Sequence, residues 1–406
     1  MTEYNIVSLF FIICTLASFT VKARIDIFAY LCISLILSVT GLRSSVGTDY
    51  DNYKNLFYDN APVEPLFRFI INIFNRLDFP FWVFLLFLCA CICLLIICNS
   101  LILFSNISQC RQSTYRLARF HATSVILSIS TSGMMGSMRT ALAFSLFMLL
   151  VTITVLYSKS NFKNIIFLVL GYSSLFFIHY SMLLWVVIFF GSLLLVQDKP
   201  LFVIKFSLRY SIKLLYRIFM LLTLSALVGV ILLNMNIMLD LLKNLNFVSS
   251  LSTQVLYKIQ VNLTDSALST HQYVNFITSG FAMFKSFTVL IPALIFYNIS
   301  YSTLDSKGKK YANFLVVSLI ISTGVQLLSI FSPPLHLFHS RSFAYINKYI
   351  FLTLLFFPLL TTTINVRNKI FPWIIFAVST LSIIFFYGAI FANYELFVPY
   401  KSILWL

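Results

Sequence analysis

Carboxylates gather in one polar stretch of a chain that is otherwise mostly apolar. Residues 43–69 hold four of the chain's 12 acidic side chains, Asp49, Asp51, Asp59 and Glu64. Gly47 permits a sharp bend just before Asp49, because glycine tolerates backbone angles that other residues avoid. Glu64-Pro65 begins a short amphipathic segment. Polar residues this concentrated predict a site.

Arginines lie at the ends of apolar runs that are long enough to be membrane spans. Arg43 ends one run, Arg139 begins another after a Ser- and Gly-rich turn, and Arg341 precedes a third. A guanidinium at such a depth is costly unless it is paired or hydrated. Its forked donors match phosphate oxygens better than a lysine does. Together with Arg68, these residues predict an anion-binding site, although each alone would also suit a plain ion pair.

His179 lies within the sequence Ile178-His-Tyr-Ser181, at a predicted turn. Its imidazole has three uses there: to accept a proton, to donate a hydrogen bond to a phosphate, or to hold the turn. The sequence alone does not choose among them.

The composition predicts the elements that must position these side chains. The chain of 406 residues is 60% hydrophobic and 10% charged, and its long apolar runs exceed what a soluble core would hide. We predict an all-α, polytopic membrane bundle that forms a single domain over 1–406, with about 12 spans. The predicted spans are 5–21, 26–42, 81–105, 118–134, 139–157, 163–178, 180–197, 218–236, 274–298, 312–331, 345–365 and 370–391.

The basic residues predict the orientation. The net charge is +16, but many basic residues fall in short loops between spans, so we predict no nucleic-acid partner. One set of alternate loops holds most of them, including Arg111, Arg116, Arg119, Lys307, Lys309 and Lys310, and that side is predicted to be cytoplasmic. Residues 43–80 and 237–273 then form outer loops, and 200–217 forms a cytoplasmic in-plane amphipathic helix.

The parity of the later loops depends on residues 164–196. This apolar run is long for one upright span and short for two, so it is either one tilted helix or a hairpin that turns near His179. We favour the hairpin, because a single span would move the lysines at 307–310 to the outer side, against the charge rule.

Four short motifs, taken in order, resemble the EpsG-like, Wzy-type bacterial polysaccharide polymerases. The opening stretch 43–53 with Glu64-Pro-Leu-Phe67 resembles the family's first signature. Met138-Arg-Thr-Ala-Leu-Ala143 resembles its Arg-Gln-x-x-Ala element, with Thr140 in place of Gln. Ile178-His-Tyr-Ser181 resembles its histidine motif, and Ser340-Arg-Ser-Phe-Ala-Tyr345 its late Arg-x-x-x-Tyr element.

The resemblance implies an O-antigen or exopolysaccharide polymerase with a GT-C-like fold. Such an enzyme is a glycosyltransferase of the bacterial inner membrane, with its active site on the periplasmic side. Its partners are an undecaprenyl diphosphate-linked donor and acceptor, membrane lipids and a chain-length regulator protein, and it needs no cofactor and no metal. Asp49-x-Asp51 has the Asp-x-Asp form of metal-dependent transferases, but that signal is weak.

The chemistry of this reaction gives the candidate residues their roles. Displacing a lipid diphosphate builds negative charge, so we predict that Arg43, Arg139 and Arg341, with Arg68, bind the diphosphate. A base must accept the proton of the attacking sugar hydroxyl, and the candidates are Asp49, ranked first, Glu64 and His179. Tyr50, Tyr53 and Tyr345 are predicted to contact the sugar. A salt bridge from Asp49 to Arg43 is the structural alternative for Asp49.

Two other functions remain open at this point. An O-antigen ligase would use the same donor and a different acceptor. A transporter or flippase would move the lipid-linked unit, but such proteins often show repeated halves or broken helices, and the sequence shows little of either.

Overall fold

The computed structural model describes residues 2–20, 25–47, 49–59, 63–107, 111–157, 162–179, 182–194, 201, 290–328, 344–361, 364–392, 397–398 and 400. Every regular element among them is helical. Several helices are apolar around their whole circumference, as expected of helices buried among others or facing lipid. The prediction of an all-α fold is therefore confirmed for the described residues.

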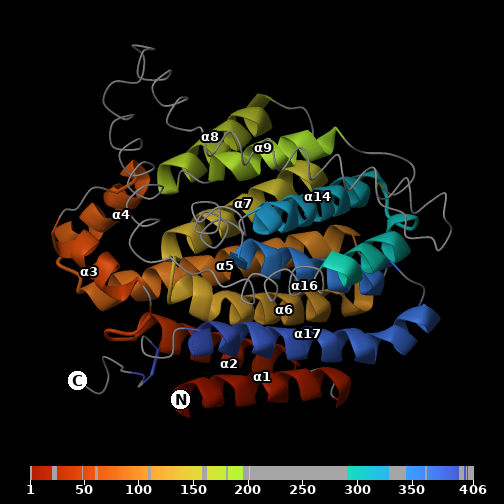
Figure 1. Cartoon of the computed structure of the whole chain (residues 1–406), viewed down its shortest axis with the longest axis horizontal. Coiled ribbons are helices and arrows are strands. Elements are labelled where there is room, and N and C mark those ends of the chain that lie inside the picture. The colour runs from red at the N-terminus through yellow and green to blue at the C-terminus, as the bar shows by residue number, and fades with distance from the viewer. Residues whose placement is uncertain are drawn as a thin grey trace.

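Most of these helices run side by side in one bundle (Figure 1). Its centre is α5 (Phe81–Ile107), which packs against α2 (Ile25–Gly41), α6 (Arg111–Ile129) and α7 (Met138–Tyr157). Further helices are α1 (Thr2–Thr20), α8 (Phe162–Ile178), α9 (Met182–Leu193), α14 (Ser306–Leu328), α16 (Ala344–Thr361) and α17 (Ile364–Ala392). The described stretch Leu290–Tyr301 is also helical.

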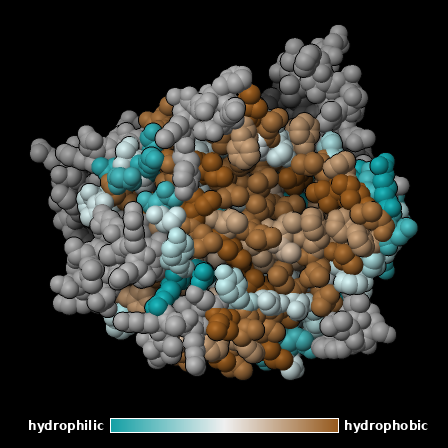
Figure 2. Space-filling model, turned by 180° about the vertical axis from the view of Figure 1, so that it is seen from behind, coloured by the Kyte–Doolittle hydropathy of each residue, from teal (hydrophilic) through white to brown (hydrophobic). Residues whose placement is uncertain are grey.

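The described part of the chain has the helices of an integral membrane protein. The segments Phe81–Ile107, Met138–Leu156 and Ile370–Gly388 are each long and apolar enough to cross a bilayer, by length and composition. Figure 2 shows one face of the molecule, where hydrophobic residues fill the middle and hydrophilic residues gather towards the edges. This distribution suits a bundle surrounded by lipid.

The helices follow the predicted spans closely where the structure describes them. The hairpin at 164–196 is confirmed, because α8 ends at Ile178, α9 begins at Met182 and the two helices pack together. The Tyr172 ring of α8 stacks on the Phe189 ring of α9, with 6.1 Å between ring centres. The predicted span 218–236, the outer loop 237–273 and nearly all of the in-plane helix 200–217 lie outside the described residues.

The two ends of the bundle differ in charge. The Lys307 ammonium group, at the start of α14, donates a hydrogen bond to the Leu156 carbonyl near the end of α7 (2.6 Å). The lysines at 307–310 and the arginines of early α6 therefore share one end, because α6 and α7 run antiparallel. At the other end, α3 (Tyr50–Tyr58) and α4 (Pro65–Arg76) lie across the bundle (Figure 1). We call α3 and α4 the end cap.

A neutral polar network lies inside the bundle. Thr152 donates to Asn99 Oδ1 (2.5 Å), and the Asn99 amide donates to the Tyr349 hydroxyl. His121 is hydrogen-bonded through its two ring nitrogens to Ser100 Oγ (2.9 Å) and Thr353 Oγ1 (3.0 Å). These residues join four helices and are fully buried. We call this set, made of Asn99, Ser100, His121, Thr152, Tyr349 and Thr353, the interior network.

Candidate functional site

The site is built around a distorted turn between α6 and α7. The last turn of α6 continues as a π-helix, η1 (Ser130–Met134), in which the Met135 N–H donates to Ser130 O (2.9 Å). Single π-helical turns interrupt α-helices often at functional sites. Gly47 lies against this turn with φ of +103°, and a Cβ there would be 2.2 Å from Met135 O. The sharp bend predicted at Gly47 is confirmed, and only glycine fits it.

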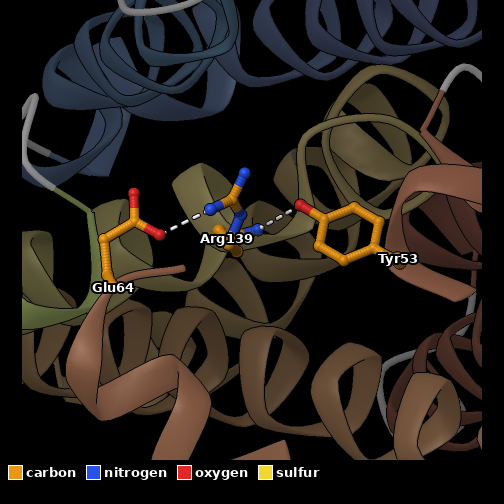
Figure 3. A network of polar contacts seen from close by, with 3 residues as sticks. All are labelled: Tyr53, Glu64 and Arg139. Atoms are coloured by element: carbon orange, nitrogen blue, oxygen red, sulfur yellow. Dashed lines mark hydrogen bonds and ion pairs between the residues drawn. The ribbon is translucent and has the colours of Figure 1, made fainter. Parts of the chain in front are cut away.

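Arg139 projects from the first turn of α7 and joins that helix to the end cap. Its guanidinium forms an ion pair with Glu64 Oε2 at 2.5 Å, and its backbone N–H donates to the Tyr53 hydroxyl at 3.0 Å (Figure 3). The Arg139 side chain is 24% exposed, whereas that of Glu64 is 6% exposed. The arginine therefore keeps an open side, while the carboxylate is almost fully enclosed.

Two aromatic rings complete the surroundings of Arg139. Its guanidinium carbon lies 5.8 Å from the ring centres of both Tyr53 and Phe67, within range for a cation–π attraction. Phe67 follows Glu64 by three residues at the start of α4, a spacing that puts both on one side of the helix. Burial raises the pKa of the Tyr53 phenol, so this group stays protonated.

Arg43, two residues after the end of α2, is fully buried. It donates to the Thr40 carbonyl and to Met138 Sδ (3.7 Å), and lies 6.0 Å from the Tyr50 ring centre. Because Met138 is the neighbour of Arg139, the structure brings the two arginines to the same turn. Their Nε atoms are buried and have no hydrogen-bond partner among the described residues.

Asp49 precedes α3 and is partly exposed. Its side chain makes no capping hydrogen bond to the helix, and it accepts a long hydrogen bond from the Asn52 amide (3.4 Å). The salt bridge to Arg43, the structural alternative predicted for Asp49, does not form between these two described residues. The Asp49 carbonyl accepts the Tyr53 N–H (3.0 Å), so Asp49 begins the turn of α3 that carries Tyr53.

Tyr50 and Tyr53 are buried against protein neighbours. The Tyr50 ring packs edge-on against Phe81 (5.4 Å between ring centres), and the Tyr53 ring packs against Phe67 (6.0 Å). Stacking on a sugar would require these rings to become exposed, so sugar contact by either tyrosine stays a prediction.

Arg68 and His179 are held by backbone hydrogen bonds in the end cap and in the α8–α9 turn. Arg68 donates to the Leu56 carbonyl (3.0 Å) and so links α4 to α3. His179 is partly buried at the turn after α8, where its carbonyl accepts from the Met182 N–H (3.1 Å). Arg341 lies outside the described residues, and for Tyr345 the structure describes the helix α16 but not the side chain.

Several residues of the site were not singled out from the sequence. Phe67 is the last residue of Glu64-Pro-Leu-Phe67. Its three-residue spacing from Glu64 is the signal that could have identified it as a neighbour of the same site. The contact of Arg43 with Met138 carries no such signal, because thioether contacts follow no sequence pattern. Within the described part of the chain, no three His, Cys, Asp or Glu side chains are grouped as metal ligands would be.

Comparison with known proteins gives a family match. The model of the EpsG family matches residues 26–402, which is nearly the whole chain. The matched region includes every residue of the site described above. No curated protein and no solved structure matches the chain.

Proposed function

The chain belongs to the EpsG family of polysaccharide polymerase-type membrane proteins, and we propose that it is an O-antigen or exopolysaccharide polymerase. The enzyme would move a growing glycan from polyprenyl diphosphate onto a lipid-linked repeat unit. The hydroxyl of the acceptor sugar attacks the anomeric carbon, the bond to the diphosphate breaks, and a base takes the hydroxyl proton.

The position of Arg139 is the observation that carries this proposal. The Arg139 side chain is partly exposed, and its guanidinium pairs with the Glu64 carboxylate. The backbone of Arg139 is held by the hydrogen bond from its N–H to the Tyr53 hydroxyl. A preorganised cation of this kind stabilises charge that develops on a leaving group, because it needs no rearrangement as the charge appears. The buried charge of Arg43 lies at the same turn and adds to the positive potential there.

We assign the diphosphate to the place that the Glu64 carboxylate takes beside Arg139. Both groups are anionic and suit the forked donors of a guanidinium. The diphosphate would replace Glu64 on Arg139, so binding the donor would also free the carboxylate. Arg68 and Arg341 complete the proposed diphosphate-binding set, Arg68 from α4 and Arg341 from the segment before α16.

Asp49 is our first candidate for the base. It is partly exposed and makes no ion pair among the described residues, so its oxygens are open to a sugar hydroxyl. Glu64, once released by the diphosphate, and His179 remain the other candidates. All three belong to the end-cap side of the bundle or to the α8–α9 turn.

The charge difference between the two ends supports the proposed orientation. By the positive-inside rule, the end with Lys307, Lys309, Lys310 and the arginines of α6 faces the cytoplasm. The end cap then lies on the periplasmic side of a bacterial inner membrane, where the lipid-linked substrates are used. The proposal includes about 12 spans in a GT-C-like arrangement and a chain-length regulator protein as partner.

Replacement of Arg139 tests the function. In cells that depend on this protein for surface polysaccharide, Arg139→Ala should lower polymerisation about 10²–10³-fold, the usual loss for one transition-state donor. Gels of the surface glycan should then show single repeat units in place of a ladder. Arg139→Lys should retain part of the activity, because it keeps the charge without the fork.

Arg76→Ala is the matched control, because Arg76 is an exposed arginine at the far end of α4. Its ladder should be normal. A normal ladder with Arg139→Ala, at equal protein level in the membrane, would contradict the proposal. Intact polymerisation with loss of transfer to a lipid or protein acceptor would instead identify a ligase.

A further inference from the structure

An apolar groove separates the end cap from the flank of the bundle. It has a volume of about 410 Å³ and lies between the start of α4, with Pro65, Leu66 and Phe69, and the second half of α8, with Leu170, Ser173 and Phe177. Phe69 is 60% exposed and Leu170 is 65% exposed, so the groove is open to the surroundings of the bundle.

One end of this groove meets the proposed diphosphate site. Pro65 lines the groove, and the residue before it, Glu64, is the ion-pair partner of Arg139. On the opposite wall, Phe177 is two residues from His179. From Phe177 the wall continues along α8 to Leu170, about 10 Å at 1.5 Å per residue. The groove therefore leads from the charged site along a helix of the bundle.

The α8 wall of the groove is held firmly in place. Gly171 lies so close to α7 that a Cβ there would be 2.8 Å from Leu150 Cδ2. A close approach of two helices at a glycine fixes their separation, as small residues do at helix contacts in membranes. The α4 wall is fixed in turn by Phe67 and Ile71, which are fully buried beside the groove-lining residues.

The chemistry of the two regions matches two parts of one amphiphile. A polyprenyl diphosphate has an anionic head joined directly to a branched, apolar chain. The head suits Arg139, and the chain requires an apolar track that starts within a few ångströms of the head. We propose that the α4–α8 groove holds the first part of this isoprenoid chain, an inference that rests on the proposed function.

The groove would affect the position of the diphosphate more than the affinity of the protein for the lipid. Lipid tails are as apolar as the side chains of the groove, so moving an isoprenoid chain from the bilayer into it brings little hydrophobic gain. A chain held in a fixed track would instead orient the diphosphate beside Arg139, and correct orientation is worth a large factor in rate. Filling the groove should therefore lower turnover while the protein remains folded.

Labelling with a photoreactive lipid tests the groove directly. The probe is a farnesyl diphosphate with a benzophenone at the end of its chain, added to the purified full-length protein in detergent. We expect labelled peptides from α4 and α8, and at least a fivefold loss of label when unlabelled polyprenyl diphosphate competes. Ser173→Trp, which fills the groove, should lower the label at least fivefold.

Val187→Trp is the matched control, because Val187 is exposed on the neighbouring helix α9 and does not line the groove. Its label should equal that of the unchanged protein. A phosphatidylglycerol with the same benzophenone tests for bulk lipid. Equal labelling of α4 and α8 by this lipid, or labelling by the diphosphate probe at other helices, would overturn the groove assignment.

Cells with the same variants separate this inference from the function. A glycan ladder that Arg139→Ala abolishes and Ser173→Trp leaves unchanged would refute the groove and keep the polymerase. A ladder that survives deletion of the protein would refute the polymerase itself. Loss of the ladder with Ser173→Trp but not with Val187→Trp, at equal protein levels, is the expected result.

Discussion

The charged site at the end cap is made of Arg43, Asp49, Glu64 and Arg139. This site and the interior network are both polar regions of an apolar bundle, and they differ in charge and in pairing. In the interior network, neutral side chains satisfy one another, as Thr152 and Tyr349 do with Asn99. At the charged site, Arg43 and Arg139 keep buried Nε atoms that have no hydrogen-bond partner among the described residues. Asp49 makes no ion pair with any described residue.

This difference separates polar groups that pair with one another from polar groups that keep unused hydrogen-bonding capacity. A fully paired neutral network fixes how helices pack and has no spare donors to offer. A buried donor without a partner costs free energy, of the order of 1–3 kcal/mol, and is kept where something else repays it. On this reasoning, substitutions at the charged site should lower activity, and substitutions in the interior network should lower stability.

Asp49→Asn gives the sharpest test at the charged site. Loss of a general base lowers a rate about 10²–10⁴-fold, and the amide keeps the size of the side chain. Because Asp49 makes no capping hydrogen bond, the protein should reach the membrane at its usual level. Asp59→Asn, at the exposed end of α3, is the control, and surface-glycan gels are the measurement. A full ladder with Asp49→Asn would transfer the base role to Glu64 or His179.

Gly47→Ala tests whether the backbone beneath the charged site sets its geometry. The added methyl group would lie 2.2 Å from Met135 O at a positive φ, so the turn before α7 must shift. A displacement of about 1 Å at a reacting centre lowers a rate about 10²-fold. Gly388→Ala is the control, because its Cβ would meet nothing within 4 Å. Equal ladders from the two variants would show that the turn does not position Arg139.

Much of the bundle could be predicted from the sequence. Long apolar runs with polar ends predict spans well, because backbone N–H and C=O groups without hydrogen bonds are too costly in the bilayer core. The start of α4 at Glu64-Pro65 and the bend at Gly47 were predicted from local signals, a proline at a helix start and a glycine before a polar turn. These features depend on residues that are close in sequence. The hairpin at His179 also needed the charge rule applied to the lysines at 307–310, because the length of its apolar run suited one span or two.

The pairing within the site could not be predicted in the same way. Glu64 and Arg139 are 75 residues apart, and an arginine at a span end suits a phosphate and a carboxylate equally well. The burial of Tyr50 and Tyr53 depends on Phe81 and Phe67, which read as ordinary apolar residues. The interior network was missed because Asn99 and His121 look isolated in the sequence, and their partners come from three helices, α5, α7 and α16.

Asn99→Ala tests the other side of the comparison. Removing this amide leaves the buried Thr152 hydroxyl and Tyr349 hydroxyl with fewer partners, at a cost of about 1–3 kcal/mol. Thermal unfolding of the purified protein in detergent should show a lower midpoint. Activity per folded molecule should be retained, because the network lies inside the bundle. Asn106→Ala, at the exposed end of α5, should leave the midpoint unchanged. Loss of activity without loss of stability would give the interior network a functional role.

Tyr53→Phe should have the smallest effect. It separates the contribution of the Tyr53 hydroxyl to holding Arg139 from that of the Tyr53 ring. The ring stays within cation–π range of the guanidinium, and only the hydroxyl that accepts the Arg139 N–H is lost. A net hydrogen bond is worth about 1 kcal/mol, so activity should fall roughly fivefold, whereas Tyr58→Phe, at an exposed ring, should have no effect. The readout is polymer length together with the protein's thermal midpoint. If activity falls while the midpoint holds, the hydroxyl positions Arg139 for its ligand. If the midpoint falls instead, the contact mainly stabilises the fold, as the interior network does. The ion pair with Glu64 alone would then orient the Arg139 guanidinium.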